Sequence, residues 1–155
     1  MKLTEATEDD IDVLVACWYA LATDMEQYSE FNTISYENVD DVPEDPFKRH
    51  LEHDDVTEYL VEESGEVIGF VTLRAGEHPS REYDTYLDIV NLLVEDDYRG
   101  QGYGSAVVSA VKELAREKGC DLLKVSWEWA NDGARRFYRD NGFEEKQVTY
   151  VHAID

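Results

Sequence analysis

A glycine-rich run in the second half of the chain has the composition of an anion-binding loop. Its residues, Arg99-Gly100-Gln101-Gly102-Tyr103-Gly104, follow a predicted strand and open a predicted helix. Glycines let the backbone turn sharply, and the free N–H groups of a first helical turn attract negative charge. No Lys-Ser/Thr pair follows the last glycine, so the run is not a P-loop. A strand-to-helix turn that merely needs glycine is the alternative interpretation of this run alone.

A second block of motif residues lies further along the chain. It reads Asn-x-x-Ala-x-x-Phe-Tyr-x-x-x-Gly-Phe from Asn131 to Phe143. Together the two blocks resemble the GNAT superfamily of N-acetyltransferases, whose first signature is Arg/Gln-x-x-Gly-x-Gly/Ala. Arg99, Gly102 and Gly104 match that signature. The match of two separate blocks in the right order makes the resemblance specific.

The resemblance implies that the chain binds acetyl-CoA as its co-substrate. The glycine loop and the first helical turn would hold the CoA pyrophosphate through backbone N–H groups. The pantetheine arm would lie between the strands expected at residues 85–94 and 122–127, bonded to the backbone of the first strand. The expected cofactor-binding residues are Leu92, Val94, Arg99, Gly100, Gln101, Gly102, Tyr103, Gly104, Ser105, Asn131 and Phe137.

The implied reaction moves an acetyl group to a primary amine by direct attack in a ternary complex. An alkyl amine is largely protonated at neutral pH, so a base must accept its proton. The resemblance points to Asp88 as this base, acting through a bridging water, and to the Leu92 N–H as the donor that faces the thioester carbonyl. Tyr138 would protonate the departing thiolate, since a phenol has a pKa of about 10. No cysteine lies in a motif for a covalent acyl-enzyme.

Competing interpretations stay open for these residues. Asp88 would otherwise be a strand-end carboxylate or a substrate anchor, with Glu128 as a second candidate base, and Tyr138 would simply pack on the sheet. His50 and His53 lie one helical turn apart, a spacing that suits either a metal site or a polar helix face. With no further clustered ligands, no metal is expected. The rival functions are a CoA-binding regulatory or sensor module without turnover and a structural, partner-binding acidic domain.

The hydrophobic pattern predicts the elements that position these residues. Strands are expected at residues 2–6, 56–63, 66–74, 85–94 and 122–127, and from Phe143 onward, especially 147–154. Helices are expected near 11–22, at 46–53, from Gly104 to Gly119, and at 131–140. The fold class is α/β, with an α+β mixed sheet of six to seven strands flanked by about four helices, as in the GNAT-like acyl-CoA N-acyltransferase fold. Residues 1–155 are expected to form a single N-acetyltransferase domain, with parallel pairing in its second half.

The composition is strongly acidic. The chain has 36 Asp and Glu against 14 Lys and Arg, a formal net charge of −22. This charge repels phosphate, so nucleic acid and anionic membranes are disfavoured as partners, and an amine-bearing small molecule, protein or peptide is the expected acceptor. The carboxylates are spread along the chain, which suggests a halophilic, salt-adapted cytoplasm, because the Debye length falls to roughly 3 Å at molar salt.

Location and assembly follow from the remaining patterns. No apolar leader and no run of membrane-spanning length occur, which predicts a soluble, cytoplasmic protein. The final strand would be exposed at a sheet edge, where it would be able to pair with a second copy and form a homodimer. The sequence does not choose among acceptor amines.

Overall fold

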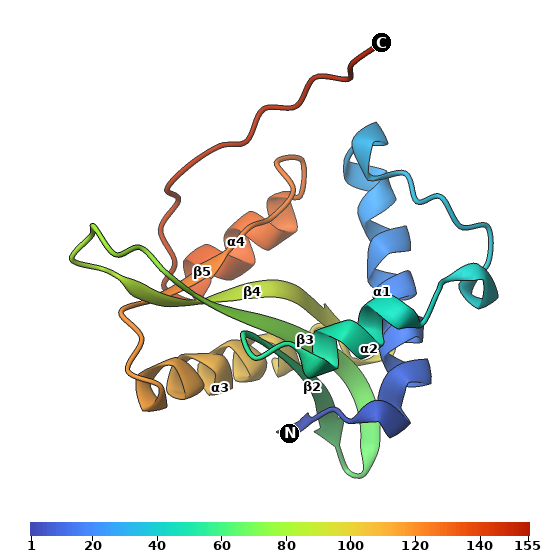
Figure 1. The fold of residues 1–155 in the computed structure, drawn as a ribbon, viewed down its shortest axis with the longest axis horizontal. Helices are drawn as coiled ribbons and strands as arrows, with labels where there is room; N and C mark the ends of the chain where they lie inside the picture. Colours follow the sequence, from blue (N-terminus) through green and yellow to red (C-terminus); the bar gives the residue numbers. More distant parts are fainter.

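The computed structural model describes residues 1–155 as a mixed sheet with helices on both faces (Figure 1). The five strands are β1 (Lys2–Glu5), β2 (Val56–Glu63), β3 (Glu66–Glu77), β4 (Thr85–Val94) and β5 (Leu122–Val125). The helices are α1 (Ile11–Met25), α2 (Asp45–Glu52), α3 (Tyr103–Glu117) and α4 (Asp132–Asp140), with short 3-10 turns between some elements. None of the helices combines the length and hydrophobicity that a membrane crossing needs.

The order of strands in space is the order in the chain, β1-β2-β3-β4-β5. The first three pairs are antiparallel, and β4 pairs with β5 in parallel across the α3 crossover. The predicted parallel pairing in the second half is therefore confirmed. A tight hairpin joins β2 to β3, because Ser64 (φ 53°) and Gly65 (φ 83°) both adopt the left-handed conformation that a two-residue turn favours.

Local signals explain how two of the helices begin. The Thr7 hydroxyl accepts a hydrogen bond from the Asp9 N–H (3.3 Å), and the Asp10 carboxylate accepts one from the Thr7 N–H (2.9 Å). This reciprocal cap starts a 3-10 turn that continues into α1. The Asn131 side-chain oxygen accepts from the Ala134 N–H (3.0 Å) and caps α4 in the same way.

Each face of the sheet packs against its own helices. On one face, Val107 and Val111 of α3 pack against a row of buried aliphatic residues on β2, β3 and β4. On the opposite face, Leu14 and Cys17 of α1 pack against Leu60, Phe70 and Leu93. We call the second face the α1/α2 face, since α2 covers its β2 end (Figure 1).

A β-bulge interrupts β4 and changes which residues reach the α1/α2 face. Thr72 of β3 pairs with Asn91, but the next residue, Leu73, pairs with Ile89, so Val90 has no partner on β3. Asp88 and Asn91 are half-buried polar residues within this otherwise mostly apolar strand. A bulge at this position re-aims the backbone groups that follow it.

The predicted final strand does not form, so the expectation of six to seven strands is wrong. Residues 144–155 are exposed, have no regular structure, and extend away from the sheet (Figure 1). Alternation of apolar and polar residues suits a strand, but a strand also needs a neighbour for its backbone groups. This segment has no such neighbour, and Tyr150 (93% exposed) and Ile154 (89% exposed) remain in solvent.

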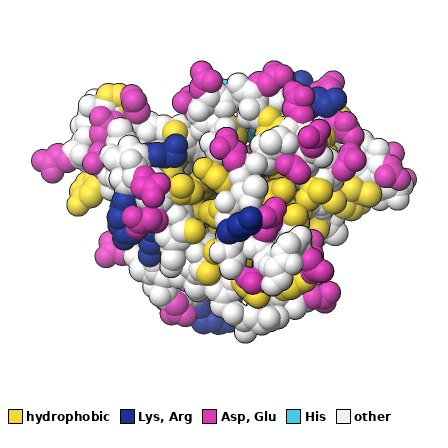
Figure 2. All heavy atoms as spheres, turned by 90° about the horizontal axis from the view of Figure 1, so that it is seen from below, with side chains coloured by type: hydrophobic (Ala, Val, Ile, Leu, Met, Phe, Trp, Pro, Cys, Tyr) yellow, Lys and Arg dark blue, Asp and Glu magenta, His cyan; other side chains and the backbone are white.

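The surface carries the charge excess that the composition implies. Figure 2 shows carboxylates distributed around the rim of one face, with basic groups confined to a few places and apolar atoms visible between them. The acidic residues form few ion pairs with basic side chains, and most of these pairs lie on the surface. Repulsion among the remaining carboxylates is therefore largely uncompensated within the chain.

Candidate functional site

The glycine loop leads into a helix start that is suited to an anion. Gly100 (φ 75°) and Gly102 (φ 85°) take the left-handed conformation, and Gly102 is the N-cap of α3. No side chain caps this end, so the N–H groups of the first turn point outward without intrahelical acceptors. A Cβ atom placed on either glycine would meet nothing within 4 Å, so the space in front of the loop is open. A phosphate group fits both the geometry and the helix dipole.

Side chains within the loop brace it against β4. The Arg99 Nε donates to the Val94 carbonyl (2.8 Å), and an Arg99 terminal nitrogen pairs with Asp96 (2.8 Å). Gln101 donates through Nε2 to the Asp97 carbonyl (3.0 Å). Arg99 and Gln101, both expected among the cofactor-binding residues, thus direct their side chains at the loop itself.

Helix α4 packs directly on the first turn of α3 and so joins the two motif blocks. A Cβ atom on Gly104 would lie 3.1 Å from the Phe137 ring. The Asn141 Nδ2 donates to the Ser105 hydroxyl (3.2 Å), and the Lys112 ammonium donates to the Asn141 carbonyl. A Cβ atom at 104 would therefore make a tight contact that the Phe137 ring has to relieve by shifting.

The strands β4 and β5 separate next to this helix start. Their ladder runs only from Tyr86–Leu122 to Ile89–Val125, while β4 continues to Val94. Beyond the ladder, the Glu95 N–H donates to the Ile68 carbonyl (2.8 Å). Hydrogen bonding alternates along an antiparallel pair, so Leu92 and Val94 direct their N–H groups away from β3, toward the open edge. An extended ligand with amide groups fits this edge as a strand would.

Tyr138 lies on α4 between two other aromatic rings. Its ring centroid is 5.0 Å from that of Phe137 and 5.5 Å from that of Phe143, both edge-to-face. Burial raises the pKa of Tyr138 to about 12. The Tyr138 hydroxyl makes no hydrogen bond within the protein. Because every buried side-chain nitrogen and oxygen has a hydrogen-bond partner, this hydroxyl is exposed to solvent. At neutral pH it is a protonated group that is free to donate.

The two candidate bases flank the point where β4 and β5 separate. Asp88 is half-buried on the α1/α2 face and pairs in register with Arg74 on β3 and Lys124 on β5. Glu128 is half-buried in the segment after β5, where its carbonyl accepts from the Asn131 N–H (2.8 Å). Asp88 thus lies one residue before the end of the β4–β5 ladder, and Glu128 lies three residues after it.

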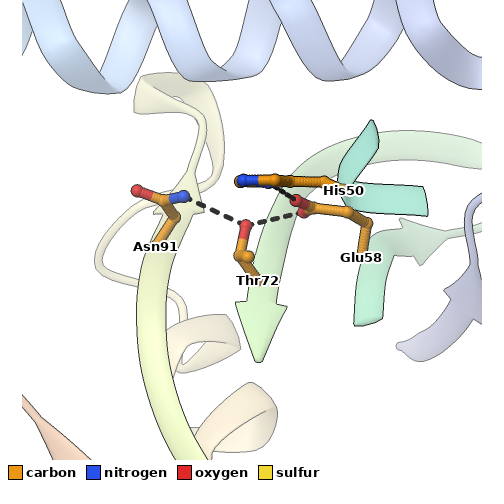
Figure 3. Close-up of polar contacts among 4 residues, drawn as sticks. All are labelled: His50, Glu58, Thr72 and Asn91. Atoms are coloured by element: carbon orange, nitrogen blue, oxygen red, sulfur yellow. Dashed lines mark hydrogen bonds and ion pairs between the residues drawn. The ribbon is translucent and has the colours of Figure 1, made fainter. Parts of the chain in front are cut away.

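Three polar residues form a row across the α1/α2 face, one each from β2, β3 and β4 (Figure 3). Glu58 is 4% exposed and accepts a hydrogen bond from the Thr72 hydroxyl at 2.6 Å. The Asn91 Nδ2 donates to the Thr72 Oγ1 (3.1 Å), and the His50 Nδ1 lies 3.4 Å from the second Glu58 oxygen. Burial raises the pKa of Glu58, while the bonds from Thr72 and His50 oppose that shift.

Sequence reasoning missed this row. Its signal is a polar residue at an inward-facing position in each of three successive apolar strands: Glu58, Thr72 and Asn91. His50, on α2, and His53, the C-cap residue after α2, also differ in role. His50 points at Glu58, while the His53 Nδ1 accepts from the Asp55 N–H (3.2 Å). No group of three His, Cys, Asp or Glu side chains converges in a way that would hold a metal ion.

Comparison with known proteins gives a consistent picture. Residues 18–143 match the family model described as the acetyltransferase (GNAT) family. The chain is 32% identical over 135 residues to an uncharacterized N-acetyltransferase, YhfO, of Bacillus subtilis, covering 86% of this chain and 87% of that protein. It is 26% identical over 153 residues to the aminoalkylphosphonate N-acetyltransferase of Salmonella typhimurium, covering 99% of this chain and 91% of the other.

Two further comparisons concern coverage and fold. The chain is 30% identical over 102 residues to an uncharacterized N-acetyltransferase of Methanocaldococcus jannaschii, and the match spans 45% of that longer protein. Among solved structures, a tetramutant of the BH1408 protein of Bacillus halodurans superimposes with a TM-score of 0.85 at 18% identity, covering 99% of this chain and 100% of that one. At this identity the likeness concerns the fold.

Proposed function

Since the chain belongs to the GNAT family of acetyltransferases, we propose that it transfers an acetyl group from acetyl-CoA to a primary amine by direct attack in a ternary complex. The observation that carries this proposal is that two binding features lie side by side. The uncapped start of α3 suits a pyrophosphate, and the open edge of β4 beside it suits an amide-bearing arm. CoA combines both groups in one molecule.

We assign the co-substrate contacts accordingly. The N–H groups of Tyr103, Gly104 and Ser105, with the turn at Gly100 and Gly102, hold the pyrophosphate. The backbone groups of Leu92 and Val94 that face the open edge of β4 form hydrogen bonds with the pantetheine arm. The Val94 carbonyl already accepts a hydrogen bond from Arg99. Asn131 and Phe137 line the arm from α4, while Arg99 and Gln101 act by holding the loop in shape.

The chemistry then requires three groups near the thioester. The amine nitrogen attacks the thioester carbonyl carbon, the C–N bond forms and the C–S bond breaks. The Leu92 N–H stabilises the charge that develops on the carbonyl oxygen. Asp88, through water, accepts the amine proton, with Glu128 as the competing base, and Tyr138 donates a proton to the departing sulfur. At neutral pH the phenol carries the proton that this role needs, and its raised pKa of about 12 makes it a weaker acid than a free tyrosine.

The acceptor we propose is a cationic amine, in a small molecule or at an exposed position of a protein or peptide. The net charge of −22 attracts such a molecule and repels nucleic acid and anionic membranes. One relative is named as an aminoalkylphosphonate N-acetyltransferase, which indicates a small amine acceptor for that protein, one that also carries an anionic phosphonate. We further propose one N-acetyltransferase domain over residues 1–155 and a cytoplasmic location adapted to high salt. The homodimer expected from an exposed final strand loses that support, because residues 144–155 form no strand.

Calorimetric titration of acetyl-CoA tests the co-substrate site. Wild-type protein in molar KCl should bind with micromolar affinity, and Gly102→Glu should abolish binding, because it adds a negative charge at the helix start. Gly119→Glu is the matched control: it places the same residue at another left-handed glycine (φ 71°) with open surroundings, at the far end of α3. Equal loss in both variants, or no binding by folded wild type, would contradict the assignment. Binding without turnover of any amine would favour a CoA sensor.

A further inference from the structure

We propose that Asn91 orients the acceptor amine through its side-chain oxygen, and that this contact selects primary over secondary amines. Thr72 and Glu58 are the positioning residues that fix the direction of the Asn91 amide. The inference rests on the proposed acetyl transfer, because it assigns a substrate contact within the same site. It concerns residues to which the motif blocks give no role.

The hydrogen-bond chain determines which end of the Asn91 amide faces Thr72. The Thr72 hydroxyl lies 2.6 Å from the Glu58 carboxylate, within the range of about 2.5–2.7 Å for a hydroxyl donating to an ionised carboxylate. Above the raised pKa of Glu58 its carboxylate is ionised and only accepts, so the single Thr72 proton is then committed to Glu58. The Thr72 oxygen can then only accept from its other neighbour. The Asn91 group at 3.1 Å must therefore be the Nδ2 donor.

With Nδ2 held by Thr72, the Asn91 oxygen is turned outward. Figure 3 shows Oδ1 on the side of the amide away from Thr72. No group in the protein donates to it, and no buried side-chain oxygen or nitrogen lacks a partner, so this oxygen is accessible to solvent. It can only accept hydrogen bonds. The protein thus presents a fixed acceptor on the surface of the α1/α2 face.

This acceptor lies where an attacking amine would arrive. Asn91 directly precedes Leu92, whose N–H points to the open edge of β4. Its partner on β3 is Thr72, and the partner of Asp88 is Arg74, two residues further along β3. Positions two apart on a strand share a face, so Asp88 and Asn91 project from adjacent rows of the α1/α2 face. An amine that approaches from this face lies beside both side chains.

The contact discriminates by the number of N–H bonds on the amine. A neutral primary amine has two. During transfer one proton passes to the base, and the other stays on nitrogen as the N–H of the product amide, so it can donate to Asn91 throughout. A secondary amine has one N–H, which must be given up to the base. Its attack would leave the Asn91 oxygen without a donor in the product-like state.

Paired kinetics test the proposal. Benzylamine and tyramine are each compared with their N-methyl analogues, and 1,4-diaminobutane with its N,N′-dimethyl analogue, so that every pair sets primary against secondary amines. The value of kcat/KM is measured for both members of each pair. Wild type should prefer the primary amine. Asn91→Leu and Thr72→Val should each lower that preference by about tenfold, the effect of one hydrogen bond, while the Kd for acetyl-CoA stays within twofold of wild type. Thr72→Ser, which keeps the hydroxyl, should recover most of the preference that Thr72→Val loses.

The outcomes separate this inference from the function on which it rests. If the variants lower kcat/KM equally for primary and N-methyl amines, or leave the ratio unchanged, Asn91 is not the orienting acceptor, although acetyl transfer stands. If folded wild type binds acetyl-CoA but acetylates none of these amines, both proposals fail. Thermal unfolding of each variant, and the behaviour of Thr72→Ser, distinguish a loss of selectivity from a loss of fold.

Discussion

Gly104 and Phe137 are in contact so close that a Cβ atom on the glycine would approach the ring to 3.1 Å. The glycine belongs to the first turn of α3 and the phenylalanine to α4, so this contact joins the two motif blocks. The aromatic ring packs beside the helix start at which we place the pyrophosphate. The site therefore depends on the small size of residue 104 as well as on the left-handed glycines before it.

Gly104→Val should destabilise the fold and weaken acetyl-CoA binding together. Two extra methyl groups beside the Cβ overpack the contact with Phe137, at a cost of about 1–3 kcal/mol. Thermal unfolding and calorimetric titration measure the two effects. Gly133→Ala on α4 is the control, because its Cβ would meet only the Asn131 oxygen at an ordinary 3.5 Å. A Gly104→Val protein with wild-type stability and affinity would show that the contact is not needed.

Tyr138→Phe should lower kcat by about 100-fold or more while acetyl-CoA still binds. The substitution removes the proton donor but keeps the ring that packs between Phe137 and Phe143. Because burial raises the pKa of Tyr138 to about 12, the hydroxyl stays protonated up to at least pH 10. The pH–rate profile of wild type should then show no alkaline fall due to this residue below that pH. Unchanged kcat in the variant would exclude Tyr138 as the acid.

Glu58→Gln should change how stability depends on pH. Burial raises the folded-state pKa of Glu58, so between its unfolded-state pKa (about 4.3) and the raised value the native state holds a proton that the unfolded chain has lost. The contribution of Glu58 to stability is thus fully present below about pH 4.3 and declines as pH rises through the folded-state pKa. Urea unfolding of both proteins from pH 4 to 8 should show wild type losing stability relative to the variant. Parallel curves would contradict the raised pKa.

Stability should rise with salt concentration. The net charge of −22 is spread over the surface, and screening shortens the range of repulsion from about 10 Å at 0.1 M to about 3 Å at 1 M. The Tm measured in KCl should increase steadily over this range. An uncharged osmolyte at equal osmotic strength is the control for effects other than screening. A Tm that is as high in dilute buffer as in molar KCl would contradict adaptation to a salt-rich cytoplasm.

The sequence alone predicted the elements whose structure depends on neighbouring residues along the chain. The segments 56–63 and 85–94 form strands with the predicted bounds, and helices form close to the ranges expected at 11–22 and 131–140. Each of these depends on local backbone conformation or on a period of hydrophobicity. The glycine loop could be identified for the same reason, because its conformation depends on residues that are adjacent in the chain.

What could not be predicted depends on pairing between distant segments. Glu58, Thr72 and Asn91 form one row only because a bulge at Ile68 shifts the hairpin register of β2 and β3 by one residue and the bulge at Val90 shifts β4. A register shift of one residue would have turned any of them to the other face. The prediction of a final strand was wrong because it also depends on a distant partner. Apolar and polar residues alternate over 147–154 as in a strand, but no neighbouring strand pairs with the backbone of this segment.

The most direct test of the account is a product assay. Protein in molar KCl is incubated with acetyl-CoA and a panel of primary amines, and mass spectrometry follows the acetylated product together with release of free CoA. The account predicts amine-dependent CoA release, in equal amount to an N-acetylated product, that is strongly reduced in Tyr138→Phe and retained in Gly119→Glu. Folded protein that binds acetyl-CoA and yields no acetylated amine, or CoA release that ignores the amine, would contradict acetyl transfer as its function.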